Sequence, residues 1–572
     1  MTTPRVRRVV RAAAVVFALG GMALGAQERT AERTVTEADL VAGFRDPGRW
    51  LTFHGDYTGR RHSPLMQLTP RNVADLVPQW VFRTDTPDVP GRGLEATPLV
   101  VDGVVYLTGN SNQAYAIDAR TGREIWRYRR ALPPDTMKYV CCGPVNRGFA
   151  LLGDRLFMQT LDAHLVALDR KTGTVAFDVA VETPTPGYYM TAAPLVVKGK
   201  VITNVSGGDR ATRGFIDAFD ARTGRHAWRF YIVPGPGERG FETWPNWEAA
   251  VRGGGNAWNS ATYDPALNLV YMGTGNPNPD YYGGGRLGDN LYTASIVALD
   301  ADTGRLKWHY QFTPHDTHDW DSAHVPVLAD VEIRGRLRQV VMVANRNSFF
   351  YVLDRATGAL LLAKPFTDNQ NWAKEIGPNG RPIVLNDGFG PPSKDTCVQD
   401  GHGGTTHQPP SYDPARRLFF VTAHETCASY TAAPETEPAT PGTRSMGGRR
   451  RNVEGTEQFA ALRAIDPATG ERKWEHRYRS YPWTVALDLA GGIMTTASGL
   501  LFTGDHEGYF MAFDSATGKM LWKFQAGGSL WGSAPMTFML DGRQWVLTTA
   551  GATLNAFALP GAGPSASPTV TR

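Results

Sequence analysis

Short apolar runs separated by turn-forming residues dominate the hydrophobic pattern of this chain. In the segment Thr97–Tyr106, two apolar runs flank the pair Asp102-Gly103, which is the arrangement of a β-hairpin. Apolar residues with the spacing of a long amphipathic helix are scarce, although an α/β fold would need many of them. The pattern therefore predicts an all-β protein.

The hairpins belong to a repeat that recurs along most of the chain. Each copy has a strand ending in Ala-x-Asp, a turn containing Thr-Gly, and a second strand that begins near a tryptophan. Copies are found at Ala116–Trp126, Ala218–Trp228, Ala298–Trp308, Ala464–Trp474 and Ala512–Trp522, with weaker ones at Ala167–Phe177 and Val352–Leu362. Asp and Thr hydrogen-bond the backbone in such a turn, Gly adopts a positive φ, and the Trp ring is buried between neighbouring units. Neighbouring copies are often about 50 residues apart, which suits a four-stranded propeller blade.

Seven copies of the repeat, together with an eighth strand end near the C-terminus, predict an eight-bladed β-propeller with tryptophan-docking motifs. The strand end Leu554–Leu559 has no Thr-Gly turn or tryptophan of its own, and the N-terminal segment Val77–Phe82 resembles the missing strand. Pairing of these two segments would close the ring and leave no free sheet edge. We therefore expect one propeller domain over residues 45–560, a long surface loop at Ala432–Asn452, and a disordered tail at 561–572.

The first 26 residues have the pattern of a signal peptide. Four arginines precede an apolar run from Ala12 to Leu24, and Gly25-Ala26 provides a small-residue cleavage site. The run is short for a membrane span, and no later segment is long and apolar enough to form one. Removal of the four arginines would lower the formal charge from +4 to 0. We therefore expect a periplasmic protein with no membrane span in the mature chain and no basic surplus that would indicate a nucleic-acid partner.

Four cysteines in 572 residues are too few for a fold held together by disulfides. Cys397 and Cys427 could form one structural bridge in an oxidising compartment. Cys141 and Cys142 are adjacent, so their Cα atoms lie about 3.8 Å apart, whereas a relaxed disulfide needs about 4.4–6.8 Å. A reduced pair and a strained vicinal bond both remain open from these residues alone. No Cys-x-x-Cys-His sequence occurs, so the chain has no attachment site for c-type haem.

Several separated motifs accompany the repeat, and together they resemble one enzyme family. They are Gly93–Val100, Cys141–Arg147, Met190–Leu195, Ser206–Asp209, Gly253–Trp258, Gly273–Asn276, Thr313–Asp321 and Asn345–Asn347. With these motifs the chain resembles the pyrroloquinoline quinone (PQQ)-dependent quinoprotein alcohol dehydrogenases of the methanol and ethanol dehydrogenase type, over nearly the whole mature chain. The resemblance implies oxidation of an alcohol to an aldehyde by hydride transfer to metal-bound PQQ. It also implies a soluble c-type cytochrome as electron acceptor, with a homodimer as one possible assembly.

The resemblance assigns a role to each motif. Cys141 and Cys142, joined as a vicinal disulfide, and the indole of Trp258 would cover the two faces of the flat cofactor. Arg147 would bind a cofactor carboxylate, and Arg346 would lie near the reactive carbonyl. The implied cofactor contacts are Glu95, Cys141, Cys142, Arg147, Thr191, Ser206, Gly207, Gly208, Trp258 and Arg346.

A metal ion and a catalytic base are implied as well. Asp319 would take the proton of the alcohol, and oxygen ligands favour calcium or a lanthanide over zinc. Asp321 has the spacing of the lanthanide-using members, and its extra charge favours a trivalent ion, with calcium as the alternative. His315 and His318 lack the Cys or His partners of a zinc site. The implied metal ligands are Asp209, Asn276, Asp319 and Asp321.

Four positions depart from the family pattern. Asp209 stands where a glutamate is usual, Thr406-His407 stands where Asn-Trp is common, and Ala490 replaces a tryptophan. We expect a shorter metal ligand and a more open or polar cofactor floor and substrate mouth. Two other functions remain to be separated from alcohol oxidation: a quinoprotein dehydrogenase for a sugar or polyol, and a non-catalytic propeller of the outer-membrane assembly type.

Overall fold

The computed structural model describes residues 1–2, 34–86, 93–182, 186–394, 396–434, 439–479 and 490–561. It divides the chain into two units, Met1–Arg33 and Thr34–Arg572, and the second contains all the helices and strands. The predicted signal peptide and the predicted disordered tail lie outside the described residues, apart from the first two residues and Gly561. The description below therefore concerns the second unit.

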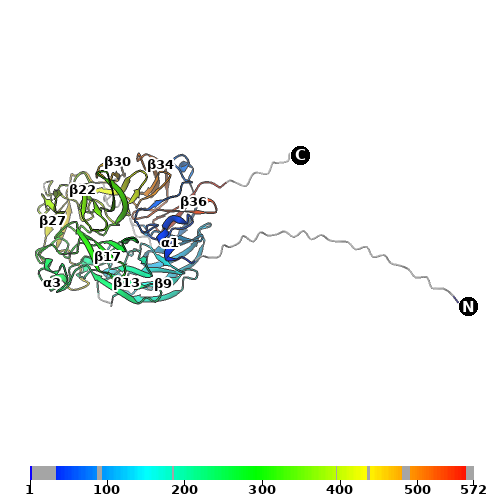
Figure 1. Ribbon diagram of the computed structural model, residues 1–572, viewed down its shortest axis with the longest axis horizontal. Coiled ribbons are helices and arrows are strands. Elements are labelled where there is room, and N and C mark those ends of the chain that lie inside the picture. The colour runs from blue at the N-terminus through cyan, green and yellow to red at the C-terminus, as the bar shows by residue number, and fades with distance from the viewer. Residues whose placement is uncertain are drawn as a thin grey trace. The chain divides into compact units, whose positions relative to one another are not determined.

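Eight mainly antiparallel sheets follow one another around a ring, and Figure 1 shows labelled strands from successive sheets in chain order around it. These sheets are called blades below. Each has four strands, except the seventh in chain order, which has five. The first four are β3–β6 (Leu99–Val101, Val104–Gly109, Gln113–Asp118, Glu124–Arg129), β7–β10 (Ala150–Leu152, Arg155–Gln159, His164–Asp169, Val175–Ala180), β11–β14 (Leu195–Val197, Lys200–Asn204, Phe215–Asp220, His226–Tyr231) and β15–β18 (Thr262–Asp264, Leu269–Gly273, Ser295–Asp300, Leu306–Gln311).

The remaining blades continue the order, with insertions in the sixth. They are β19–β22 (Val327–Ile333, Arg336–Ala344, Phe349–Asp354, Leu360–Pro365), β25, β26, β29 and β30 (Ser411–Asp413, Leu418–Glu425, Phe459–Ile465, Arg472–Arg477), β31–β34 (Met494–Thr496, Leu500–Gly504, Tyr509–Asp514, Met520–Gln525) with β1 (His62–Ser63), and β35–β37 (Met536–Leu540, Arg543–Ala550, Thr553–Ala558) with β2 (Val77–Arg83). The predicted eight-bladed propeller is therefore confirmed.

The N-terminal strand β2 closes the ring. It pairs antiparallel with β37, from Val77 opposite Ala558 to Arg83 opposite Thr553. This pairing confirms the prediction that Val77–Phe82 completes the last blade, and it covers what would otherwise be a free edge of β37. The ring is thus held shut by backbone hydrogen bonds between segments from the two ends of the propeller sequence.

Tryptophans join six of the eight described blades to the next, while Phe177 and Lys364 lie against the turn glycine at the other two junctions. The indole N–H of Trp126 donates to the carbonyl oxygen of Arg170 in the following blade at 2.9 Å, and its ring lies against Gly173. A Cβ on Gly173 would lie 2.6 Å from that ring, and the φ of +71° also favours glycine. The same indole-to-carbonyl bond occurs in the pairs Trp80–Ala119, Trp228–Ala301, Trp308–Arg355, Trp474–Ser515 and Trp522–Leu76.

The Asp-x-x-Thr-Gly turns, most of which receive one of these rings, are called the docking turns below. They are Asp118–Gly122, Asp169–Gly173, Asp220–Gly224, Asp300–Gly304, Asp354–Gly358, Asp466–Gly470 and Asp514–Gly518. In the first, Oδ1 of Asp118 accepts from the backbone N–H and the hydroxyl of Thr121, both at 2.9 Å. The turn chemistry predicted from the repeat is therefore present.

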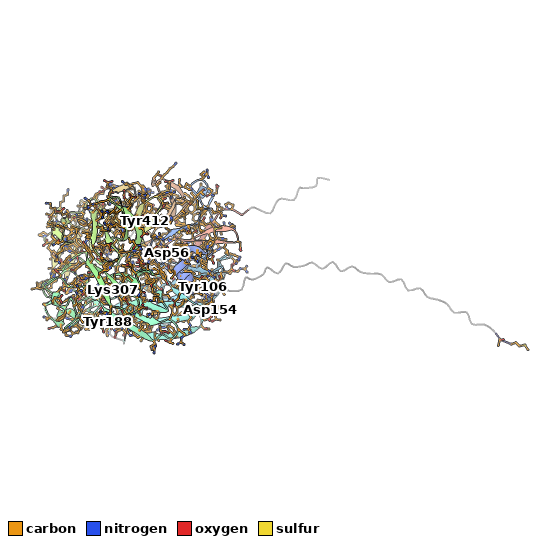
Figure 2. The ribbon with its side chains drawn as sticks, in the orientation of Figure 1. Asp56, Tyr106, Asp154, Tyr188, Lys307 and Tyr412 are labelled. Atoms are coloured by element: carbon orange, nitrogen blue, oxygen red, sulfur yellow. A yellow bond between two sulfur atoms is a disulfide. The ribbon has the colours of Figure 1, made fainter. Side chains whose placement is uncertain are left out.

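Helices are short and lie outside the blades. They are α1 (Glu37–Ala42), α2 (Thr136–Tyr139) and α3 (Trp247–Ala250), with 3-10 turns η1 (Gly43–Arg45), η2 (Val73–Asp75), η3 (Asn110–Asn112), η4 (Gly208–Arg210) and η5 (Phe241–Thr243). Within the described residues, no helix is long and apolar enough to cross a membrane. Figure 2 shows how densely side chains fill the space between the sheets.

Two hairpins are inserted near the sixth blade. One is β23 and β24 (Ala373–Ile376 and Pro382–Val384), and the other is β27 and β28 (Ala428–Ala432 and Gly448–Asn452). The second corrects the prediction of a loop over Ala432–Asn452. The polar composition of this segment concealed a strand, β28, in which Arg449 and Arg451 face outward. Its partner β27 contributes the buried Tyr430. The predicted bridge between Cys397 and Cys427 is present at the start of this region.

Candidate active site

The predicted site residues lie at one end of the blades. In an antiparallel blade, the start of the first strand and the connection from the second to the third strand are at the same end. Glu95 precedes the first strand of its blade, as do Arg147, Thr191, Trp258 and the pair Asp319 and Asp321; Ser206–Asp209, Asn276 and Arg346 follow second strands. Five successive blades therefore direct these residues to a common place, called the pocket end below. The docking turns connect third to fourth strands and lie at the opposite end.

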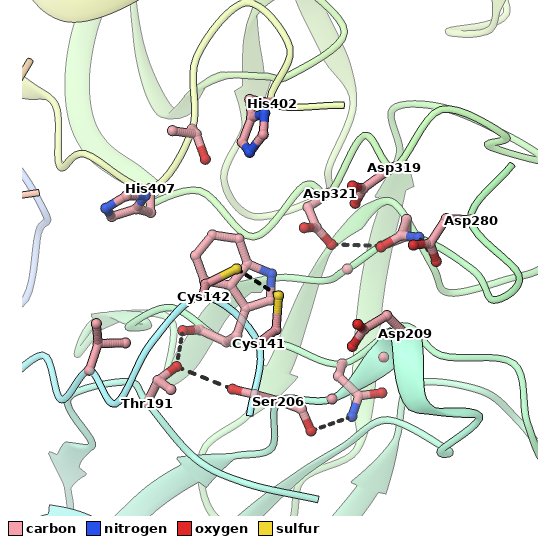
Figure 3. Close-up of a pocket in the computed structure, with 18 of the residues that line it drawn as sticks. Cys141, Cys142, Thr191, Ser206, Asp209, Asp280, Asp319, Asp321, His402 and His407 are labelled. Carbon is pink, nitrogen blue, oxygen red and sulfur yellow. Dashed lines mark hydrogen bonds between the residues drawn. The ribbon is translucent and has the colours of Figure 1, made fainter. Parts of the chain in front are cut away.

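A single pocket collects these side chains. It has about 990 Å³ of space between its atoms, part of it open to solvent, and every predicted cofactor contact and metal ligand lines it. Figure 3 shows Cys141, Cys142, Thr191 and Ser206 on one side and a group of aspartates on another. The lining residues that the sequence did not assign are Val145, Tyr189, Asn256, Gly275, Asp280, His402, Arg444, Met446 and Trp531.

Arg147 connects three of the predicted cofactor contacts. Its Nη2 lies 2.6 Å from Oε2 of Glu95, and its Nη1 donates to Oγ1 of Thr191 at 2.8 Å. The guanidinium carbon is 5.2 Å from the ring centroid of Trp258. The Nε of Arg147 is buried and has no hydrogen-bond partner in the described part of the chain. A buried cationic donor beside an indole is suited to a flat anionic group.

Arg346 connects the two aspartates expected at the reacting end. Its Nη1 lies 3.1 Å from Oδ2 of Asp321 and 3.5 Å from Oδ1 of Asp319, and it donates to the backbone oxygen of Asp319 at 2.7 Å. Burial raises the pKa of Asp319 well above its ordinary value, Asp280 raises it further, and Arg346 acts in the opposite direction. Burial also raises the pKa of Asp321, again against the effect of Arg346. The arrangement holds two carboxyl groups around one cation.

The other implied metal ligands have different partners. The backbone N–H of Asn276 donates to Oδ1 of Asp321 at 2.9 Å, and its amide nitrogen donates to Oδ1 of Asp280, also at 2.9 Å. Oδ2 of Asp209 lies 3.2 Å from Nε of Arg444. Burial raises the pKa of Asp280 well above its ordinary value, and Asp209 raises it further. The pocket thus gathers four aspartates, one more than the sequence predicted.

The two adjacent cysteines differ from the expectation. Cys141 and Cys142 are free cysteines in the structure, with their Sγ atoms 2.6 Å apart, so the predicted vicinal disulfide is not formed there. Both thiols line the pocket, and Cys142 has a φ of +69°, while Asp319 has a φ of +63°. Such backbone strain in residues other than glycine is concentrated at functional sites. The covalent bond stays a prediction, which peptide mapping of protein kept under oxidising conditions tests.

Comparison with known proteins identifies the family. The PQQ family model described as "Glucose/ethanol/alcohol dehydrogenase, beta-propeller domain" matches residues 50–364 and 457–546. The chain belongs to the PQQ-dependent alcohol dehydrogenase family. The family assignment from the sequence motifs is therefore confirmed.

Relatives and solved structures resemble the chain over most of its length. Quinohemoprotein alcohol dehydrogenase ADH-IIG of Pseudomonas putida is 38% identical over 94% of this chain and 77% of its own length. Quinoprotein alcohol dehydrogenase PedH of Pseudomonas putida is 35% identical over 94% of this chain and 91% of its own. A europium-containing methanol dehydrogenase has a TM-score of 0.83 at 31% identity and covers 91% of this chain and 100% of its own.

The pocket residues fit the quinone of this family. The unpartnered Nε atoms of Arg147 and Arg346, both buried, provide cationic donors within the described residues. Trp258 lies near both guanidinium groups, at 5.2 Å and 5.6 Å from its ring centroid, and supplies a flat wall. These features match a planar tricarboxylate.

The residues fit a hard metal ion in chemistry. The implied donors are all carboxylate or amide oxygens, which calcium and lanthanides prefer. Within the described ranges, no three His, Cys, Asp or Glu side chains are grouped closely enough to hold an ion as they stand. The ion pair of Asp209 with Arg444 is one reason, because it directs that carboxylate toward a cation of the protein itself.

The departures from the family pattern have different consequences. Thr406 and His407 line the pocket, and His407 lies 3.5 Å from Glu95 and 4.8 Å, between ring centroids, from Trp531. The expectation of a more polar pocket wall at these two positions agrees with the geometry. Ala490 instead packs in a buried apolar cluster and is not among the lining residues.

Two unassigned residues had weak signals in the sequence. Asp280 follows Asn276 in the same connection, so its closeness to a predicted ligand could have marked it. His402 precedes the segment Gly404–His407, and its Nδ1 lies 3.0 Å from Nη1 of Arg450. Arg444 lies in the segment between β27 and β28 and had no motif at all.

Proposed function

We propose that this protein is a periplasmic alcohol dehydrogenase that oxidises an alcohol to an aldehyde in this pocket, using PQQ and one metal ion. The observation that supports the proposal most directly is the convergence of the predicted site residues from five successive blades on one pocket. Family membership supports the same reaction. A non-catalytic scaffold would have no need for buried carboxylates and arginines at this place.

The cofactor would be held by contacts already in place. Arg147, fixed by Glu95 and Thr191, would bind a carboxylate of the quinone with its free Nε. Trp258 would cover one face, and Cys141 with Cys142 would cover the other. When bound, the quinone accepts the hydride that the alcohol carbon loses, and a metal ion polarises the quinone carbonyl. Glu95, Ser206, Gly207 and Gly208 would complete the cofactor contacts.

Asp319 would take the hydroxyl proton of the alcohol. Arg346 holds its backbone oxygen at 2.7 Å and lies 3.5 Å from its carboxylate, which keeps the base at the pocket wall. Asp319 would thus accept the proton that the alcohol must lose, in addition to its hydride, to leave as the aldehyde. Asp209, Asn276, Asp319 and Asp321 are the proposed metal ligands, and the three carboxylates favour a lanthanide over calcium.

Electrons would pass to a separate soluble c-type cytochrome. The chain has no Cys-x-x-Cys-His sequence that could attach a haem. Purified protein with the spectrum of covalently bound haem would contradict this part of the proposal.

Reconstitution tests the proposed reaction. The purified protein is incubated with PQQ and either calcium or a lanthanide, and dye reduction is followed with simple alcohols, diols and sugars as substrates. We expect alcohol-dependent dye reduction with at least one ion, and a larger rate with the lanthanide. The polar pocket positions Thr406 and His407 favour substrates with a second hydroxyl as the alternative class. Absence of turnover with every alcohol and both ions would refute the proposal.

A further inference from the structure

Asp280 is a buried carboxylate in the pocket to which neither the sequence motifs nor the family roles assign a part. It lies in the connection between β16 and β17, its side chain lines the pocket, and it is 2% exposed. Figure 3 places it beside the group formed by Asp209, Asp319 and Asp321. A carboxylate this deeply buried needs a hydrogen-bond donor, a cation, or both.

The donor is the side-chain amide of Asn276. Its nitrogen donates to Oδ1 of Asp280 at 2.9 Å and to the backbone oxygen of Pro277 at 3.1 Å, so both amide hydrogens are used. The amide oxygen accepts no hydrogen bond from any described residue, although Asn276 is only 8% exposed and lines the pocket. Asp280 thereby fixes the amide with its oxygen available to the pocket. An oxygen in this state is a ready ligand for a hard cation.

The cation is not supplied by the described part of the chain. Asp209 has Arg444 at 3.2 Å, and Asp321 has Arg346 at 3.1 Å, but no Arg, Lys or His nitrogen of the described residues forms an ion pair with Asp280. The charges of Arg286 and Arg444 act on Asp280 without an ion pair, since Arg444 lies against Asp209. Arg286 donates to Oδ1 of Asn290 at 2.8 Å and to the backbone oxygens of Pro279 and Asp316. Burial makes the charged form of Asp280 costly, and a cation bound beside it would stabilise that form.

We propose that Asp280 is a positioning residue of the metal site, which turns the amide oxygen of Asn276 toward the ion and adds a buried negative charge that selects trivalent over divalent cations. This inference rests on the proposed function, because the ion is the one that the PQQ-dependent family implies. Asp280 acts on the ion through Asn276 and through its charge. Asp209 has a shorter side chain than the usual glutamate and is paired with Arg444, so the charge of Asp280 would offset its weaker contribution to the ion.

Metal titration of the purified protein tests the two roles separately. Terbium(III) and calcium(II) are titrated without PQQ, by terbium luminescence and by calorimetry. Asp280→Asn retains an oxygen that can accept from Asn276, so it removes the charge and keeps the orientation. Coulomb attraction scales with ionic charge, so if terbium affinity falls about 100-fold, calcium affinity falls about 20-fold. Asp280→Ala also releases the amide and weakens both ions further.

A matched control is available in the same connection. Asp289→Asn removes an exposed carboxylate that pairs with Arg381 at 2.7 Å, and we expect unchanged affinity for both ions. Thermal unfolding of each variant shows that it is folded, and the isosteric Asp280→Asn carries the test if Asp280→Ala does not fold.

Three results would overturn the inference: parent-like terbium affinity in Asp280→Asn, a loss for terbium no larger than for calcium, or an equal loss in Asp289→Asn. Failure of the proposed function is distinguishable from these results. A parent protein that bound both ions, with affinity dependent on Asp280, but oxidised no alcohol with PQQ would refute the function and support the metal role. A parent that bound neither ion would overturn both.

Discussion

The two ends of this propeller are built on different principles. At the end with the docking turns, the same few contacts recur from blade to blade: Asp118 and Thr121 close a turn, and the Trp of the preceding blade packs on Gly122. At the pocket end each functional side chain occurs once, and five blades contribute different residues. Because the repeated contacts lie at one end, the residues at the pocket end can differ from blade to blade.

The energetic character of the two ends differs as well. The docking turns satisfy their hydrogen bonds and bury apolar rings, so each stabilises the fold. The pocket end contains buried carboxylates with raised pKa values, among them Asp280 and Asp319. These features cost stability. We infer that the docking turns hold the ring together while the pocket end is free to perform chemistry, and the following predictions test that division.

The largest effect is expected from Asp319→Asn. The change removes the proposed base but keeps the side-chain shape, so the rate of alcohol oxidation should fall about 1,000-fold, within the usual range for loss of a general base. The melting temperature should stay close to that of the parent, because the residue contributes no packing at the docking turns. Dye-linked turnover and thermal unfolding measure the two quantities. Substantial activity in this variant would remove Asp319 from the mechanism.

Trp126→Ala should lower the free energy of unfolding by about as much as Asp319→Asn raises the activation free energy of the reaction. The change leaves a cavity against Gly173 and removes the hydrogen bond to Arg170, with a loss of about 3–5 kcal/mol in the free energy of unfolding. Denaturant unfolding measures this loss. The folded fraction should still bind PQQ with parental affinity, because the residue lies at the opposite end of its blade. Weaker PQQ binding by the fully folded Trp126→Ala variant would show that the two ends are coupled.

The difference between the ends also explains how far the sequence could be interpreted. Docking turns such as Asp118–Gly122 are made by residues adjacent in the sequence, so the sequence alone predicts their hydrogen bonds. The closing strand at Val77 was then predicted from the number of turns. Pocket residues were found where they belong to a family motif, as with Arg147. Asp280, His402 and Arg444 belong to none, and only the folded chain brings them to the pocket. The β27–β28 hairpin was missed because its exposed face is polar.

A smaller effect is expected from Trp258→Ala at the pocket end. The change removes the flat wall beside Arg147 and Arg346, and PQQ affinity should fall about tenfold, as expected for loss of one stacking face. Fluorescence titration with PQQ measures the affinity. Stability should change less than in Trp126→Ala, since Trp258 is only partly buried. If the stability loss exceeded the binding loss, the indole would be a structural residue.

The smallest effect concerns Asp505, which also lies at the pocket end but does not line the pocket. Burial raises its pKa from 3.8 to about 6, and Glu507 adds to the shift. Because the folded-state pKa is the higher one, ionisation destabilises the fold as the pH rises from about 4 to about 6. Asp505→Asn keeps an acceptor for the backbone N–H of Tyr509 and should be more stable than the parent at pH 8, by on the order of 2 kcal/mol. Denaturant unfolding at pH 4 and pH 8 should show the gain only at pH 8; an equal gain at both would contradict the cause given.

Direct titration of the purified protein with PQQ, in the presence of a lanthanide or calcium, tests the central claim that the pocket end holds the quinone. The account predicts saturation at one equivalent per chain, with affinity reduced in Trp258→Ala and unchanged in the folded fraction of Trp126→Ala. Absence of saturable binding to the parent, or equal loss of binding in both variants, would contradict it.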